Sequence, residues 1–158
     1  ATLGTVAEAK NHSLTVAECN IDDMSGEVWP YVQEKLMAAG ALDAWITPII
    51  MKKGRPAQML SVLMHPQDLP VLKKIILTET TTLGMRYYDV ARHCSERSFI
   101  EVALPQGSVK VKFSQAGGQI LNIAPEFEDC RKLAEASKMP LKKIMQMAAA
   151  AAEAQLEH

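Results

Sequence analysis

The sequence predicts an α+β protein with a ferredoxin-like split βαββαβ core, an antiparallel β segment after it, and two C-terminal helices. Short segments rich in apolar residues and bounded by turn residues indicate strands at 14–21, 42–50, 58–65 and 85–90. Helical patterns at 25–39 and 66–77 separate the first strand from the second and the third from the fourth. This order is typical of the split βαβ arrangement, in which two helices cover one face of an antiparallel sheet.

The two helices of this core have recognisable beginnings. Ser25 can cap the first helix, Glu27 in its first turn is favoured by the helix dipole, and Gly40 ends it. Pro66 suits the first turn of the second helix. The apolar face of the second helix consists of Leu69, Leu72, Ile75 and Ile76.

The second half of the chain begins with strands. We expect strands at 97–104, 108–114 and 119–123, joined by turns that contain glycine. In the middle strand, apolar residues alternate with Lys110, Lys112 and Ser114, which predicts one buried face and one basic, solvated face. Helices are expected from Pro125 to about Ser137 and from Pro140 onward, the last one with an alanine-rich stretch.

The predicted organisation is one domain with weakly patterned ends. Residues 1–13 are interpreted as a linker or frayed end, 14–92 as the ferredoxin-like core, and 93–155 as the β segment with its helices. Residues 156–158 resemble the start of a histidine tag. The weak pattern at the start is what a cut from a longer parent protein would leave.

Composition excludes several classes of function. The chain has 158 residues and a net charge of −1, so bulk nucleic-acid binding is not indicated. No apolar segment approaches the roughly 20 residues of a membrane span, and we expect no membrane contact. The three cysteines form no CxxC pair, which favours a reducing compartment, and we expect a cytoplasmic protein.

A basic turn stands between the second and third predicted strands. Lys52, Lys53 and Arg55 surround Gly54, and Pro56 follows. Gly54 can adopt positive φ, which favours a tight reversal that holds the three cations together. Such a cluster is either a solvated turn or a phosphate site, in which arginine supplies a bidentate fork and the lysines act as point charges.

Acidic residues lie at the end of the first strand. Glu18, Asn20 and Asp22 alternate, so they project to the same face while the chain is extended, and Asp23 follows. Their oxygens suit a hard cation such as Mg²⁺ or Mn²⁺. The alternative is that Asp22 and Asp23 only precede and cap the helix at Ser25.

A run of hydroxyl residues precedes the fourth strand. Thr80, Thr81 and Thr82, with Gly84 and Arg86, could bond phosphate oxygens. A run of threonines is more often ordinary strand or turn material. Histidines and cysteines show no metal-ligand spacing, and no Walker motif or catalytic-serine motif is present.

These motifs together resemble the C-terminal domain of the LarC family, the nickel insertion proteins of lactate racemase maturation. The resemblance covers nearly all of residues 14–150. The motifs that carry it are Glu18–Met24, Gly40–Asp43, Thr47-Pro48, Met51–Pro56, Glu79–Gly84 with Arg86, and Pro125-Glu126 with Glu128–Cys130. The N-terminal region of the family is missing from this sequence, so the chain resembles an isolated half.

The resemblance implies a CTP-dependent cyclometallase, a lyase of the nickel-chelatase type. Such an enzyme inserts Ni²⁺, its substrate, into pyridinium-3,5-bisthiocarboxylic acid mononucleotide to make the nickel-pincer nucleotide. The C-terminal domain would be the CTP-binding half, working with Mg²⁺ or Mn²⁺ and with the N-terminal half of the same protein. The isolated half is expected to be incomplete for turnover.

The resemblance also suggests how the clusters divide the work. Lys52, Lys53 and Arg55 would neutralise the phosphates, and Arg86 with the threonines Thr80, Thr81 and Thr82 would complete the cradle. Asp22 and Asp23, with Glu18, would hold the metal ion. Asp22, Asp23 and Lys53 are then the candidate catalytic residues.

A different class of function stays open at this stage. Ferredoxin-like domains often assemble through their sheets, so the chain could be a non-catalytic module that binds a nucleotide or organises its parent protein. A homo-oligomer is expected in either case, and a trimer with sites between subunits would be natural for such a module. A nickel carrier is disfavoured by the scarcity of histidine and paired cysteine.

Overall fold

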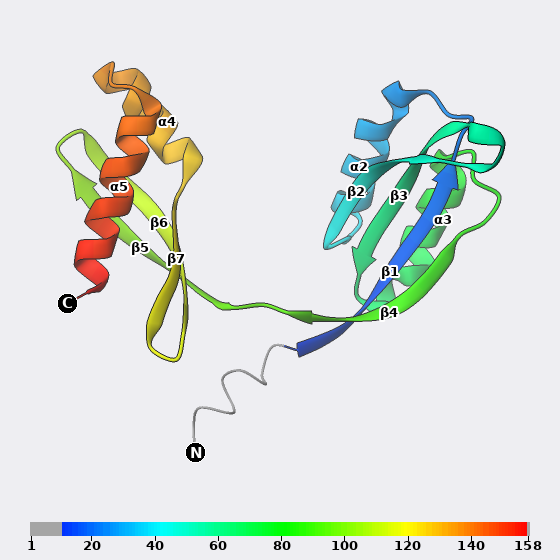
Figure 1. Cartoon of the computed structure of the whole chain (residues 1–158), viewed down its shortest axis with the longest axis horizontal. Helices are drawn as coiled ribbons and strands as arrows, with labels where there is room; N and C mark the ends of the chain where they lie inside the picture. The colour runs from blue at the N-terminus through cyan, green and yellow to red at the C-terminus, as the bar shows by residue number, and fades with distance from the viewer. Residues whose placement is uncertain (1–10, 158) are drawn as a thin grey trace. The chain divides into compact units, whose positions relative to one another are not determined.

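The computed structural model describes residues 11–157, which form two compact units (Figure 1). The first unit comprises Asn11–His93, and the second begins at Cys94. Each unit has its own antiparallel sheet and its own apolar core. The expected α+β fold class is therefore confirmed.

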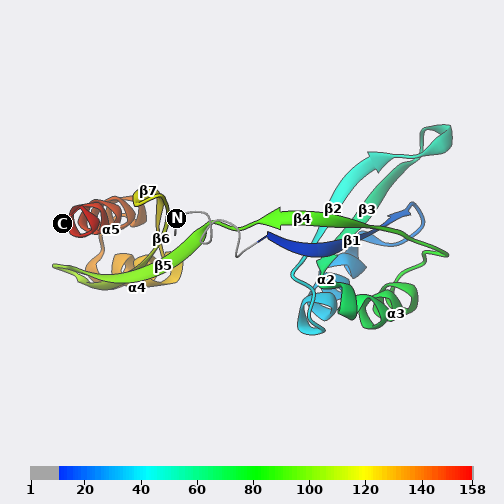
Figure 2. The ribbon, with the colours of Figure 1, turned by 90° about the horizontal axis from the view of Figure 1, so that it is seen from below.

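The first unit is a four-stranded sheet in the order β2-β3-β1-β4, with every neighbouring pair antiparallel. Figure 2 shows both helices on the same face of this sheet. This is the strand order and layering of a ferredoxin-like fold. The elements are β1 Asn11–Ile21, α2 Trp29–Ala38, β2 Asp43–Ile50, β3 Pro56–Met64, α3 Leu69–Glu79 and β4 Arg86–His93.

The side chains of β1 alternate between the apolar core and the opposite face of the sheet. Ala17, Cys19 and Ile21 are buried in the cluster that the helices cover. Since successive side chains of a strand point to opposite faces, Glu18 and Asn20 lie on the uncovered face. The central strand thus contributes both core residues and candidate ligands.

Both helices of this unit begin with a single 3₁₀ turn that the sequence did not predict. Ser25 caps the turn Gly26–Val28, because its Oγ accepts a hydrogen bond from the Glu27 N–H at 3.4 Å. The turn Pro66–Asp68 similarly precedes α3. Prolines at position 30 and position 70 lie in the first turns of the α-helices proper, where a missing N–H costs little.

The second unit is a three-stranded antiparallel sheet, β5-β6-β7, with two helices. Its core joins Val102, Val109 and Val111 of the sheet to Ile144 and Ala148 of the last helix. The alternation expected for the middle strand is therefore confirmed. The elements are β5 Glu96–Leu104, β6 Gly107–Ala116, β7 Gln119–Pro125, α4 Phe127–Ser137 and α5 Leu141–Leu156.

Several boundaries differ from the expected ones because pairing partners extend the elements. β1 begins at Asn11, not at Leu14, and its first residues pair with the end of β4, which itself runs to His93. Pro125 ends β7 opposite Val111 and does not begin a helix. Leu156 is the last residue of α5, and the expectation that residues 156–158 come from a tag stays a prediction.

The described part of the chain contains no helix that is both long and apolar enough to cross a membrane.

The cysteines are all unpaired, and Cys19 and Cys130 are buried. Burial raises the pKa of the Cys19 thiol, an effect that the nearby Thr82 hydroxyl and Arg86 charge oppose. Burial likewise raises the pKa of Cys130, and neighbouring Asp129 adds to the rise. Both thiols are therefore held in the neutral form, which is the poor nucleophile.

Candidate functional site

The three polar clusters of the first unit meet at one end of its sheet. The end of β1, the turn between β2 and β3, and the segment that leads into β4 lie on the same side of the unit (Figure 2). Three side-chain contacts connect them, one to each of Asp22, Asp23 and Glu18. Residues separated by up to 68 positions in the sequence thus form one surface.

The basic turn contacts the acidic cluster through Arg55. Its Nη1 lies 3.7 Å from Oδ2 of Asp22, and the two side chains are 61% and 28% exposed. An ion pair this long and this exposed adds little stability. Lys52 and Lys53 are exposed, and neither takes part in an ion pair within residues 11–157. The turn therefore keeps two lysine charges available to an anion.

The backbone of the turn is more strained than expected. Gly54 has φ +69°, as its position in a tight reversal predicts, but Lys53 also has a positive φ of 61°. A left-handed conformation costs a residue with a side chain about 1–3 kcal/mol. The loop is closed by hydrogen bonds from Met51 N–H to the Arg55 carbonyl and from Gly54 N–H to the Met51 carbonyl. The strained lysine is thus held at the tip of the β2–β3 hairpin.

The threonine segment contributes one direct contact to the site. The Thr81 hydroxyl donates a hydrogen bond of 2.6 Å to Oδ1 of Asp23. Thr80 Oγ1 instead donates to the Ile76 carbonyl at the end of α3, and Thr82 Oγ1 donates to the Gly84 carbonyl. The structure therefore gives Thr80 and Thr82 roles in shaping the segment, and their predicted phosphate contacts stay predictions.

Arg86 joins β4 to β1 on the uncovered face of the sheet. It is the register partner of Glu18, and its Nε lies 3.3 Å from Glu18 Oε1. Its Nη2 donates to Asn20 Oδ1 at 3.2 Å and also contacts the Met59 sulfur at 3.2 Å. Since a guanidinium has five N–H donors, these contacts still leave donors for an anion.

Tyr88 also lies on this face of the sheet, and the sequence did not predict it as a site residue. Partial desolvation raises the pKa of its hydroxyl, and the Glu18 carboxylate raises the pKa further while Arg86 opposes it. Tyr88 therefore keeps its proton and can donate a hydrogen bond. Arg86 and Tyr88 are two residues apart in β4, so their side chains lie on the same face of the sheet. The pairing of Arg86 with Glu18 shows that this is also the face of Glu18, but that pairing is known only from the structure.

The donor set fits a divalent cation only if that cation arrives with its own phosphate ligands. Within the described residues, no group of three or more His, Cys, Asp or Glu side chains is arranged to hold a metal ion. Glu18 contacts Arg86, whereas Asp22 and Asp23 are exposed at the end of β1. Mg²⁺ in nucleotide sites is commonly bound by one or two carboxylates together with substrate phosphates and waters. Asp22 and Asp23 match that requirement, and Glu18 stays a predicted third ligand.

Comparison with known proteins gives consistent matches over most of the chain. The family model described as nickel insertion protein matches residues 1–145. A relative from Myxococcus xanthus is 45% identical over 151 residues, which is 96% of this chain and 39% of the relative. The pyridinium-3,5-bisthiocarboxylic acid mononucleotide nickel insertion protein of Acetivibrio thermocellus is 42% identical over 144 residues, which is 90% of this chain and 35% of that protein. The chain thus spans about two fifths or less of the length of these relatives.

Two solved structures have a fold similar to that of the chain. One is described as LarC2, the C-terminal domain of a cyclometallase involved in the synthesis of the NPN cofactor of lactate racemase, in its apo form. It has a TM-score of 0.84 and 40% identity, and the match covers 90% of this chain and 99% of that one. A protein from Methanopyrus kandleri AV19 has a TM-score of 0.66 at 22% identity, with 89% of this chain and 88% of that one covered, and shows the fold alone.

Proposed function

Because the chain belongs to the nickel insertion protein family, the LarC family, we propose that it is the nucleotide-binding part of a nickel cyclometallase. The whole enzyme would insert Ni²⁺, its substrate, into pyridinium-3,5-bisthiocarboxylic acid mononucleotide and consume CTP. This part would bind CTP together with Mg²⁺ or Mn²⁺. The similarity to the C-terminal domain of a cyclometallase supports this division of the work.

The observation that supports the proposal is that two lysines without an ion pair in residues 11–157 lie on the turn that reaches the exposed carboxylates Asp22 and Asp23. Lys52 and Lys53 project from the turn that Arg55 connects to Asp22. A metal–triphosphate complex needs both kinds of group, since its phosphates carry negative charge and its metal accepts carboxylate oxygens. A turn that served only solubility would not need the acidic cluster beside it.

In this proposal each side chain has a definite task. Lys52, Lys53 and Arg55 bind phosphate oxygens, and Arg86 is positioned by Glu18 and Asn20 to bind another. Asp22 and Asp23 would hold the metal ion, with Thr81 orienting Asp23 through its hydrogen bond. When bound, the divalent ion supplies charge neutralisation at the phosphates. The cations of the turn would stabilise negative charge that develops on a departing phosphate or pyrophosphate.

The relatives are longer than this chain, and we assign the remaining tasks to the N-terminal half of the parent protein. That half would supply the site for the pyridinium mononucleotide and for nickel. The nickel-pincer product itself is not expected from the present chain. A homo-oligomer such as a trimer, and a cytoplasmic location, stay predictions.

Nucleotide consumption distinguishes this proposal from a non-catalytic module. The chain is incubated with CTP and Mn²⁺, and released phosphate and pyrophosphate are measured for the wild type and for Asp22→Asn. Although this part is incomplete for nickel insertion, we expect the wild type to release phosphate or pyrophosphate slowly. Asp22→Asn should lose at least about tenfold of this rate, because it removes a charge from a metal ligand. The non-catalytic module would instead be supported if CTP binding depends on Asp22 but phosphate and pyrophosphate are released no faster than without the protein.

A further inference from the structure

The second unit has a basic face that the nucleotide site does not use. In β6 the valines at 109 and 111 pack into the core, so Lys110, Lys112 and Ser114 lie on the opposite face. The pairing register places Arg97 of β5 and Asn122 of β7 directly beside Ser114. Three adjacent strands therefore present cationic and hydrogen-bonding side chains at the same level of the sheet.

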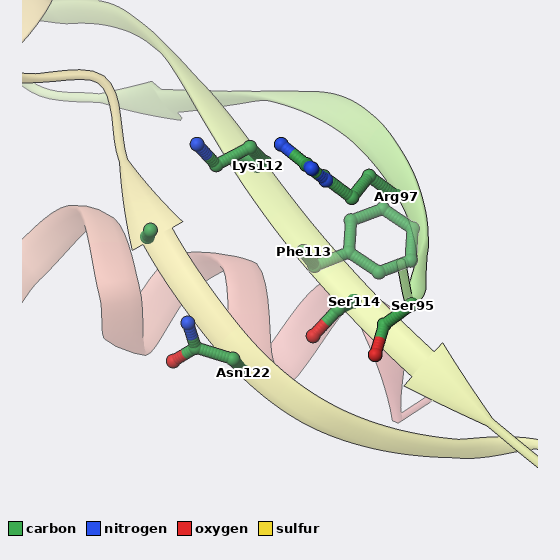
Figure 3. Close-up of a pocket in the computed structure, with 7 residues that line it drawn as sticks. Ser95, Arg97, Lys112, Phe113, Ser114 and Asn122 are labelled. Carbon is green, nitrogen blue, oxygen red and sulfur yellow. The ribbon is translucent and has the colours of Figure 1, made fainter. Parts of the chain in front are cut away.

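Except for Lys110, these side chains line a hollow of about 250 Å³, together with Ser95, Phe113 and Ala124. Figure 3 shows Arg97 and Lys112 extending next to one another, with their nitrogen ends directed the same way. The hydroxyl groups of Ser95 and Ser114 lie near each other, and the Asn122 amide comes from the neighbouring strand (Figure 3). The hollow thus combines two positive charges with three neutral hydrogen-bonding groups.

The two positive charges have no acidic partner in the described part of the chain. No ion pair there includes Arg97 or Lys112, although Lys112 is half-buried. Lys110, by contrast, is exposed and stands opposite Glu101 in the register. Neighbouring like charges repel, and partial burial weakens the screening by water. An anion in the hollow would offset both costs.

We propose that this hollow is a second anion site, which binds the phosphate group of a small phosphomonoester or of free phosphate. Arg97 supplies a fork of N–H donors that matches two phosphate oxygens, and Lys112 supplies a point charge. The serine hydroxyls and the Asn122 amide donate to the remaining oxygens. Sites for drug-sized ligands occupy roughly 300–1,000 Å³. The hollow is smaller, so it suits a phosphate group and not a whole nucleoside triphosphate.

A neighbouring aromatic ring distinguishes the two sources of phosphate. Phe99 is the register partner of Lys112, lies two residues after Arg97 and is 60% exposed. Its ring gives the organic part of a phosphomonoester an apolar surface on which to stack. A mononucleotide should therefore bind more tightly than inorganic phosphate, and the difference should disappear in Phe99→Ala.

The test is a titration of the ¹⁵N-labelled chain with inorganic phosphate and with nicotinamide mononucleotide, followed by amide chemical shifts. Each titration is repeated in Lys53→Ala, so that binding at the β2–β3 turn is separated from binding at the hollow. We expect saturable shifts of the amides at 97, 112, 114 and 122. Arg97→Gln and Lys112→Gln should each weaken binding about tenfold, the effect of losing one charged hydrogen bond.

Lys110→Gln is the matched control, since it removes a lysine from the same face of the same strand but outside the hollow. It should leave the affinity within about twofold, because its charge stands opposite Glu101 and is exposed. Shifts confined to residues 52–55, or equal affinity in Arg97→Gln and the wild type, would overturn the proposal. The nucleotide site lies in the other unit, so a failure of CTP binding leaves this result unaffected.

Discussion

Lys53→Ala is expected to weaken metal-dependent CTP binding by about ten- to a hundredfold. Lys53 lies at the tip of the β2–β3 hairpin, is exposed, and keeps a positive φ of 61°. A hydrogen bond to a charged group contributes about 1.5–3 kcal/mol, and each 1.4 kcal/mol is a factor of ten in affinity. Calorimetric titration of CTP in Mn²⁺ buffer measures the change directly.

Lys138→Ala is the control for this substitution. Lys138 is the other described non-glycine residue with a positive φ, 57°, and it follows α4 in the second unit. Both variants replace a left-handed lysine by alanine, so they match in charge removed and in backbone conformation. We expect Lys138→Ala to bind CTP as the wild type does. Equal losses in both variants would mean that Lys53 acts only through net charge.

Leu72→Ala is expected to destabilise the first unit by about 2–5 kcal/mol. Leu72 is fully buried between α3 and the sheet, where it packs with Leu36 and Ile76 in the core. Alanine removes three carbon atoms and leaves a cavity that surrounding side chains fill only in part. A loss of this size is a large fraction of the stability of a small unit.

The two tryptophans make this effect measurable in the presence of the second unit. Trp29 and Trp45 both belong to the first unit and are the only tryptophans of the chain. Their fluorescence during urea unfolding therefore reports on that unit alone. Leu77→Ala is the control, since it changes the same residue type in the same helix at a position that is 45% exposed. Similar losses in the two variants would contradict the described core.

The fold could be predicted from sequence because its signals are local. Helix starts at Ser25 and Pro66, and the alternation along β6, each need only a few neighbouring residues to be recognised. The order of the elements then leads to the split βαβ arrangement. Boundaries were less predictable because distant partners decide them. The start of β1 at Asn11, for example, depends on its pairing with His93.

The candidate site could be predicted only in part, for the same reason. The clusters around Asp22, Lys53 and Thr81 are visible as residue types, but their contacts join segments far apart in the sequence. The pairing of Glu18 with Arg86, and the approach of Tyr88 to Glu18, follow from the register of β4 against β1, which no local pattern specifies. The positive φ of Lys53 was also not predictable, since glycine was the expected residue for that conformation.

The most direct test of the nucleotide site is calorimetric titration of this chain with CTP in Mn²⁺ buffer. Titrations with ATP and with CTP in metal-free buffer are run beside it. We expect saturable binding of CTP that requires the metal and is clearly tighter than binding of ATP. The absence of binding by either nucleotide would contradict the assignment of Asp22, Asp23, Lys52, Lys53 and Arg55, while the family membership would stand.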